Sequence, residues 1–157
     1  MTHDDLQRFI QRQGIQAELL LLEMPTPTVE SAAQALQVGT EQILKSLLFF
    51  VDGEPLLVLA NGTRRVMRGK LGRARGVGRR QVRLADPAEV AAWTGFAVGT
   101  VPPFGHRRPV AVLIDQSVLD QATIYGGGGG HSAMLRLAVS ELLRVTDGTP
   151  ADLTADS

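Results

Sequence analysis

Lys45 is the residue whose surroundings in the sequence most directly suggest chemistry. It lies in the segment ILKSLLFF, residues 43–50, which is otherwise typical of a buried strand. A lysine there costs free energy unless its ammonium group reaches water or an anion. Two interpretations stay open. The side chain extends to solvent at a strand edge, which is the commoner outcome, or it points into a pocket and holds a phosphate or carboxylate.

A second candidate is the segment TGFAVGTVPPFGH, residues 94–106. Pro102 and Pro103 fix the backbone φ angle and have no N–H group to donate. Gly99 and Gly105 allow the backbone to approach another group closely. The segment could therefore present main-chain N–H and C=O groups at fixed positions, or it could be a stiff connection between a helix and a strand.

The third candidate is a run of five glycines, residues 126–130, followed directly by His131. The run lacks the G-K-[ST] ending of a phosphate-binding P-loop, and a linker has no place in a chain of one domain. Within a strand pattern, glycine marks a bulge or a close backbone approach, and its N–H groups could bind a carbonyl or an oxyanion. His131 is the titratable neighbour, although a single histidine more often has a structural role.

Positive charge is concentrated in one part of a chain whose formal net charge is zero. Nine of the sixteen basic residues lie between Pro55 and Ala85, and that window contains no acidic residue. Such segregation favours a polyanionic partner. A solvated basic helix face is the usual alternative.

Composition excludes several classes of site. The 157 residues predict one domain, and an aromatic content of 4% argues against a base-stacking platform. Without cysteine there is no disulfide, thiolate nucleophile or cysteine-bound zinc, and three scattered histidines make a poor metal cluster, so we expect no metal and no cofactor. The sequence has no Ser/His/Asp signature, no bilayer-spanning apolar run and no signal peptide, so we expect a cytoplasmic protein without membrane contact.

The apolar patterns predict a mixed α/β domain. Predicted helices cover residues 4–13, 28–37, 64–75 and 87–93, with a short one from Ser140. Thr28 and Asp86 are the predicted N-terminal caps of the second and the fourth of these helices. Predicted strands cover residues 17–22, 43–51, 55–60, 81–84, 109–114, 122–125 and 132–137. Asp52-Gly53 is a hairpin turn signal between two of these strands. Because hairpins join several strands, the sheet should be largely antiparallel. We expect one domain over residues 1–147, followed by a frayed polar tail over residues 148–157.

Several short motifs occur together in a fixed order. They are TVESAAQAL at residues 28–36, I-x-K-S-L at 43–47, T-G at 94–95, G-x-x-x-P-F-G at 99–105, a strand ending in Ile114-Asp115, and the glycine-rich turn. In this order they resemble the YbaK/prolyl-tRNA-editing domain family over roughly residues 28–143. Two features depart from the family pattern: the five consecutive glycines, and Ala138-Val139-Ser140 where many members have a proline.

The resemblance implies a curved, mostly antiparallel central sheet flanked by helices. It also implies a metal-independent hydrolase that acts in trans on mischarged tRNA and cleaves the ester between the amino acid and the terminal adenosine. The partners would be the acceptor end of aminoacyl-tRNA and, in some settings, an aminoacyl-tRNA synthetase. A lysine matching Lys45 would steer the 3′ end, and the loop from Gly99 to Pro103 would hold the aminoacyl group. His131 would shape the aminoacyl pocket.

The residues and the resemblance together predict three groups of site residues. At the reacting centre we expect Lys45, Gly99 and Pro103. Around the aminoacyl group we expect Thr28, Ser46, Phe104, Gly127, Gly128, Gly129 and His131. On tRNA phosphates we expect Arg64, Arg65, Arg68, Lys70 and Arg73. The alternatives are a non-catalytic module that binds tRNA or a synthetase, and a regulator that binds a small amino-acid-like ligand. The sequence leaves open the amino acid, the tRNA, and whether the protein is a monomer or a homodimer.

Overall fold

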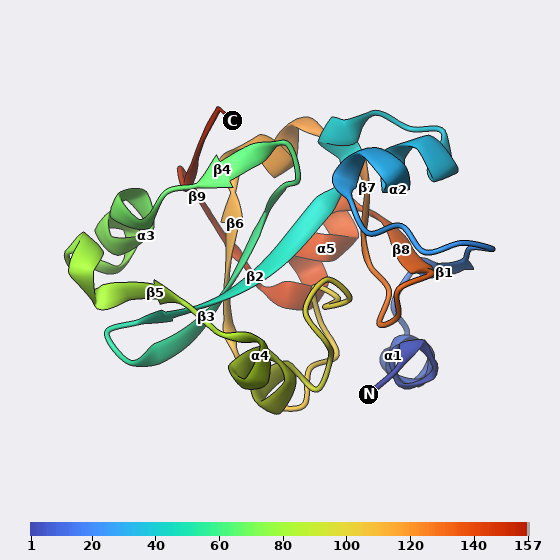
Figure 1. Cartoon of the computed structure of the whole chain (residues 1–157), viewed down its shortest axis with the longest axis horizontal. Coiled ribbons are helices and arrows are strands. Elements are labelled where there is room, and N and C mark those ends of the chain that lie inside the picture. The colour runs from blue at the N-terminus through green and yellow to red at the C-terminus, as the bar shows by residue number, and fades with distance from the viewer. Residues whose placement is uncertain (157) are drawn as a thin grey trace.

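A five-stranded sheet with the order β5-β2-β3-β6-β9 forms the centre of this computed structural model, which describes residues 1–156 (Figure 1). Its strands are β2 (Leu44–Val51), β3 (Glu54–Asn61), β5 (Val82–Leu84), β6 (Ala111–Asp115) and β9 (Thr149–Ala151). The hairpin predicted at Asp52-Gly53 joins β2 to β3, and β5 pairs antiparallel with the second half of β2. The pairs β3–β6 and β6–β9 are parallel, so the central sheet is mixed.

Two smaller antiparallel sheets flank the centre. The first has the order β1-β8-β7, with β1 (Ala17–Leu21), β7 (Thr123–Gly127) and β8 (Ala133–Ala138). A single bridge between Ile43 and Tyr125 connects it to the start of β2. The second pairs β4 (Arg64–Val66) with β10 (Thr154–Asp156). The predicted mixed α/β fold, with mostly antiparallel strand pairs, is confirmed.

Short helices cover the sheets, and several begin at the caps that the sequence predicts. They are α1 (His3–Gln13), α2 (Val29–Leu36), α3 (Arg68–Arg75), α4 (Pro87–Thr94) and α5 (Val139–Thr146), with 3-10 turns η1 (Thr40–Gln42), η2 (Arg79–Gln81) and η3 (Gln116–Asp120). Thr28 caps α2 by accepting from the Ser31 N–H, and Asp86 caps α4 by accepting from the Glu89 N–H. Both caps satisfy N–H groups that have no acceptor within the helix. Among residues 1–156, no helix is long and apolar enough to cross a membrane.

The central strands β2 and β3 are mostly apolar because the sheet is covered on both faces. Side chains alternate along a strand, so neighbours enter different cores. Leu57 and Leu59 of β3 pack into a core shared with α1, α5, β7 and β8. Leu56 and Val58 pack on the other face, against Leu71 of α3.

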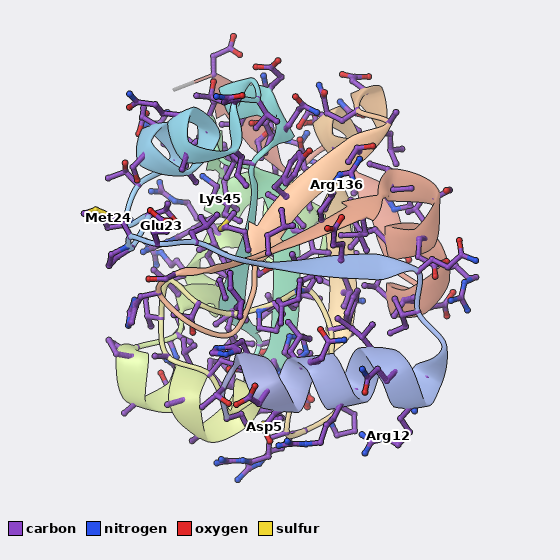
Figure 2. The ribbon with its side chains drawn as sticks, turned by 90° about the vertical axis from the view of Figure 1, so that its right-hand side faces the viewer. Asp5, Arg12, Glu23, Met24, Lys45 and Arg136 are labelled. Carbon is purple, nitrogen blue, oxygen red and sulfur yellow. The ribbon has the colours of Figure 1, made fainter. Side chains whose placement is uncertain are left out.

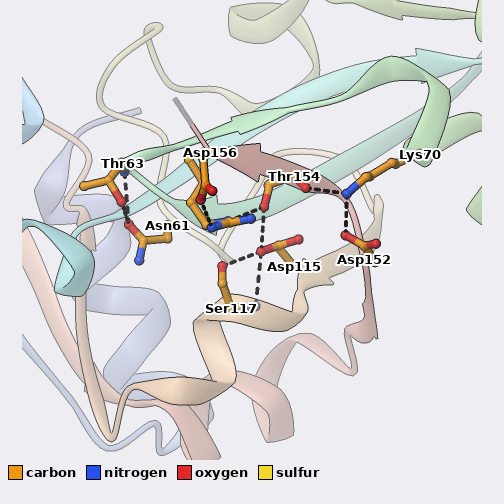
Figure 3. A network of polar contacts seen from close by, with 9 residues as sticks. Asn61, Thr63, Lys70, Asp115, Ser117, Asp152, Thr154 and Asp156 are labelled. Carbon is orange, nitrogen blue, oxygen red and sulfur yellow. Dashed lines mark hydrogen bonds and ion pairs between the residues drawn. The ribbon is translucent and has the colours of Figure 1, made fainter.

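Two predictions near the basic segment and the C-terminus are wrong. Residues 64–75 do not form one helix, because residues 64–66 pair as β4 with β10 before α3 begins at Arg68. Residues 148–156 do not form a frayed tail, because residues 149–151 and 154–156 are strands and Leu153 is fully buried; residue 157 lies outside the described residues. Polar groups there have specific partners, above all Asp115, whose carboxylate accepts a hydrogen bond from the Leu153 N–H. It also accepts one from the Thr154 hydroxyl, which Figure 3 shows.

Candidate functional site

A pocket of about 290 Å³ lies where the first half of β2 meets the segment before α2 and the loop after α4. Five predicted site residues line it: Thr28, Lys45, Ser46, Gly99 and Gly127. Much of the remaining wall is apolar and comes from Leu48, Ala85, Val90, Val98 and Met134. Ligand pockets in proteins have this character, with a few polar groups set in an apolar lining.

A larger and more open hollow of about 750 Å³ lies elsewhere, next to the β2–β3 hairpin and Trp93. None of the predicted catalytic or aminoacyl-binding residues lines it. The smaller pocket is therefore the candidate site, because chemistry depends on converging polar groups and not on volume.

Lys45 lies in a part of β2 that β5 leaves unpaired. β5 pairs with residues 49–51, and the Ala85 N–H after it donates to the Leu48 oxygen at 2.9 Å. The edge of β2 at residues 44–47 is therefore left to line the pocket. Figure 2 shows Lys45 on the side of the molecule that carries α2 and the segment with Glu23 and Met24. The side chain is half-buried, and this burial lowers the pKa of the Lys45 ammonium group below its usual value. Desolvation of this kind penalises the charged form.

The Lys45 ammonium group is anchored at one point. Its Nζ donates a hydrogen bond to the main-chain oxygen of Arg64 at the start of β4. An ammonium group has three donors, and the described residues offer no acceptor for the other two. Lys45 thus lines the pocket, as the second interpretation expects, and binding of a phosphate or carboxylate by its ammonium group stays a prediction.

Ser46, the next residue of β2, also lines the pocket. Its Oγ is buried and has no hydrogen-bond partner among residues 1–156. A buried hydroxyl without a partner costs free energy, roughly 1–3 kcal/mol. A polar ligand group that reached this hydroxyl would satisfy it.

The loop that contains Gly99 is held in shape by local hydrogen bonds. Gly99 has a φ of +85°, which side chains rarely allow, and it is exposed at the pocket. Thr100 closes a turn by donating from its N–H and its Oγ1 to the Ala97 oxygen, at 3.0 and 2.8 Å. The predicted rigid presentation of main-chain groups thus has a structural basis at Gly99.

His106 fixes the other end of this loop, and no signal in the sequence identified it. Its Nε2 lies 2.7 Å from the Pro102 oxygen, and because a carbonyl oxygen can only accept, Nε2 carries the proton. Burial lowers the pKa of His106, against the smaller opposing effect of the Pro102 hydrogen bond. The neutral imidazole is therefore the form that the folded protein favours.

Pro103 and Phe104 belong to the same loop but do not line the pocket. Both are buried, and Phe104 stacks on Phe9 of α1 with a centroid distance of 6.0 Å. Their placement suits anchoring of the loop to α1. Direct contact of Phe104 with an aminoacyl group stays a prediction, and the pocket lining does not include it.

Other backbone segments of the protein pack directly against the glycine run. A Cβ atom on Gly127 would lie 2.4 Å from the Val101 oxygen, and one on Gly128 would lie 2.6 Å from the Ala133 carbonyl carbon. The Gly129 N–H donates to the Thr100 oxygen at 2.9 Å, so it is not free to bind an oxyanion. The segment that approaches the run most closely is therefore the loop that carries Gly99.

Within this run, Gly127 lines the pocket and the later residues do not. Gly128 and Gly129 are buried between β8, α1 and the loop at Thr100. The His131 side chain is exposed, while its main-chain oxygen accepts from the Thr26 N–H at 3.1 Å. Its backbone thereby holds one rim of the pocket, and a role for its imidazole stays a prediction.

The five basic residues predicted to bind tRNA fall into two groups. Arg64 and Lys70 are engaged by the C-terminal residues, through ion pairs of 2.7 Å to Asp156 and 3.0 Å to Asp152. The other three are exposed and form no ion pair within residues 1–156: Arg65, Arg68 and Arg73. Arg68 also lines an open hollow with Arg79 and Arg80, both exposed. The exposed cations of the basic segment therefore lie mainly on α3 and η2, with Arg65 on β4.

Comparison with known proteins identifies the family. Residues 23–145 match the family model described as "Aminoacyl-tRNA editing domain". The chain belongs to the aminoacyl-tRNA editing domain family. This confirms the resemblance inferred from the motifs, and every residue of the pocket lies within the matched segment.

Relatives of two kinds match the chain. It is 39% identical over 123 residues to a proline–tRNA ligase of Nitratidesulfovibrio vulgaris (strain DP4), a match covering 76% of this chain and 21% of the ligase. The chain thus spans about a fifth of the proline–tRNA ligases it matches. It is 31% identical over 121 residues to the uncharacterized protein YwhH of Bacillus subtilis (strain 168), covering 76% of this chain and 75% of that protein.

Solved structures share the whole architecture. One described as a candidate trans-editing enzyme for prolyl tRNA synthetase superposes with a TM-score of 0.91 at 34% identity, covering 98% of this chain and 96% of the other. The shared fold therefore extends beyond the matched family segment, to the N-terminal helix and the C-terminal strands.

Proposed function

We propose that this protein is a trans-editing deacylase, which hydrolyses the ester between a mischarged amino acid and the 3′ end of its tRNA. The observation that carries the proposal is that three predicted site residues with polar groups line one small apolar pocket. These are the Lys45 ammonium group, the unpartnered Ser46 hydroxyl and the main chain at Gly99. Membership of the editing-domain family supports the same reaction.

Each feature has a role in this reaction. The Lys45 ammonium group binds a phosphate near the terminal adenosine and orients the 3′ end. The aminoacyl side chain enters the apolar part of the pocket, and the main chain at Gly99 contacts the aminoacyl group. The Ser46 hydroxyl hydrogen-bonds the ester or the amino group. These contacts fix the reacting atoms relative to one another.

The reaction needs little beyond positioning. An aminoacyl ester is already activated, so orientation and stabilisation of the developing oxyanion supply most of the required rate. The free ribose hydroxyl of the terminal adenosine activates the attacking water in this scheme. A Ser/His/Asp triad is then unnecessary, in keeping with the sequence.

We propose that the substrate is tRNA(Pro) carrying a small wrong amino acid, such as alanine or cysteine. The support is the similarity to proline–tRNA ligases and to the candidate trans-editing enzyme for prolyl tRNA synthetase. A pocket of about 290 Å³ suits a small aminoacyl group.

The body of the tRNA would dock on the exposed cations of α3 and η2. Binding through phosphates depends on salt, and removing one cation that pairs with a phosphate lowers the salt slope by about one. The double variant Arg68→Ala/Arg73→Ala should therefore lower the slope by about two. Arg136 of β8 forms an ion pair with Glu18. The variant Arg136→Ala removes this cation and should leave the salt slope unchanged.

A deacylation panel tests the proposal. Purified protein is mixed with Ala-tRNA(Pro), Cys-tRNA(Pro) and Pro-tRNA(Pro), and the loss of the aminoacyl group is followed against spontaneous hydrolysis. We expect at least one mischarged species to be hydrolysed and Pro-tRNA(Pro) to be spared. Tight tRNA binding without turnover of any species would instead identify a binding module. Amino-acid binding that is independent of tRNA would identify a small-ligand regulator.

A further inference from the structure

The position of the Lys45 ammonium group depends on β4. Lys45 Nζ donates to the main-chain oxygen of Arg64, the first residue of β4. β4 is only three residues long, and β10 is its partner in a two-stranded sheet. Short strands of this kind have little stability of their own, so the partner decides where β4 lies.

The Arg64 side chain strengthens the same pairing. Its Nε donates to Thr154 Oγ1 at 2.7 Å, and its Nη1 donates to Asp156 Oδ1 at 2.7 Å. Arg64 is thus attached to β10 through its side chain while its carbonyl oxygen holds Lys45. Movement of β10 would move the acceptor of the Lys45 ammonium group.

A buried carboxylate in turn fixes β10 (Figure 3). Asp115, at the end of β6, accepts from the Leu153 N–H at 2.9 Å, from Thr154 Oγ1 at 3.0 Å, and from the Ser117 hydroxyl. Burial alone would raise the pKa of Asp115, but these hydrogen bonds outweigh it and the net pKa lies below the usual value. Leu153 adds a fully buried side chain to the core under α3.

We infer that the C-terminal strand β10 is a positioning element for Lys45, acting through Thr154 and Arg64 from the fixed carboxylate of Asp115. β10 lies outside residues 23–145, the segment that matches the family model. Its effect on catalysis rests on the proposed function, whereas its effect on the Lys45 side chain does not.

The chain allows a direct test because it contains two lysines, Lys45 and Lys70. Lysine labelled with ¹³C at Cε then gives two signals in an NMR spectrum, assigned through the variants Lys45→Arg and Lys70→Arg. A pinned lysine has two inequivalent Hε protons, and these become equivalent when the side chain rotates freely. The separation of the Lys45 Hε signals therefore reports its anchoring.

Thr154→Val is the main variant, because it keeps the shape of the side chain and removes both hydroxyl contacts. We expect the two Lys45 Hε signals to converge, and Thr154→Ser to restore their separation. Asp156→Ala changes an exposed residue, so it is the second variant if Thr154→Val does not fold. We expect it to bring the two Lys45 Hε signals closer together, by less than Thr154→Val does. Asp152→Asn is the matched control, because it breaks an ion pair of the same segment with Lys70 and should leave the Lys45 signals unchanged.

Kinetics give the second readout. Thr154→Val should lower kcat/KM for deacylation by on the order of tenfold, since misplacement of a positioning group by 1 Å can cost about a hundredfold. The loss should vanish when Lys45 is already alanine, because the effect runs through Lys45. Lys45 signals that stay separate in both Thr154→Val and Asp156→Ala, while amide exchange shows β10 released, would overturn the inference. A wild-type protein with separate Lys45 signals but no deacylation would refute the proposed function alone.

Discussion

Gly127→Ala tests whether the loop that carries Gly99 packs so closely on Gly127 that no side chain fits there. A Cβ atom at position 127 would lie 2.4 Å from the Val101 oxygen, 2.8 Å from its carbonyl carbon and 2.9 Å from the Thr100 oxygen. Ordinary contact begins near 3.4 Å, so the backbone at residues 100–101 must move by about 1 Å. Backbone cannot rotate out of the way as a flexible side chain can.

The size of the effect follows from that displacement. Overpacking of this kind costs about 1–3 kcal/mol of unfolding free energy. For a chain of this length, each kcal/mol lowers Tm by about 2–4 °C. The same shift moves the pocket wall at Gly99 and should lower the deacylation rate by on the order of a hundredfold.

Gly126→Ala is the matched control in the same strand. Its Cβ atom would lie 3.6 Å from Leu44, which is ordinary contact, so stability and activity should stay close to wild type. Urea unfolding and single-turnover deacylation of both variants measure the two effects. Equal stability and equal activity of the two variants would refute the close approach of the loop to Gly127.

Two further predictions concern the loop. Gly99→Ala and Gly14→Ala both place a side chain at positive φ in open space, so each should lose about 1 kcal/mol of stability, and only Gly99→Ala should lose deacylation. Equal activity of the two would show that the Gly99 backbone is not part of the site. Burial lowers the pKa of His106 below its usual 6.5, so the unfolded chain takes up a proton more readily than the folded one. The stability from the neutral imidazole is therefore complete above pH 6.5 and falls as the pH drops from there towards the folded pKa. Urea unfolding at about pH 7.5 and about pH 5.5, one unit either side of that value, should show a smaller fall in His106→Asn, and an unchanged fall would contradict the assigned neutral form.

The sequence predicted those parts of the fold that local pattern determines. Two apolar runs and the Asp52-Gly53 turn located the β2–β3 hairpin, and Thr28 and Asp86 located two helix starts. Lys45 stood out because a charged residue in an apolar strand needs an explanation. These signals depend on neighbours in the chain, which the sequence displays directly.

Features that depend on distant contacts could not be predicted in the same way. Asp115 meets Leu153 across 38 positions, so the polar composition of the C-terminal residues wrongly suggested fraying. The glycine run indicated a close approach, but nothing local identified residues 100–101 as the segment that approaches. Arg64 was predicted as a tRNA contact from charge alone, whereas its side chain lies against Thr154 and Asp156.

Single-turnover hydrolysis of mischarged tRNA(Pro) by wild type, Lys45→Ala and Arg136→Ala tests the central claim most directly. Both variants remove one positive charge, but Lys45 lines the pocket whereas Arg136 lies on the exposed face of β8. We predict hydrolysis by wild type and Arg136→Ala at similar rates, and a loss of about tenfold or more in Lys45→Ala. Equal rates for all three proteins, or no hydrolysis by the wild type, would contradict the assignment of this pocket as a deacylase site.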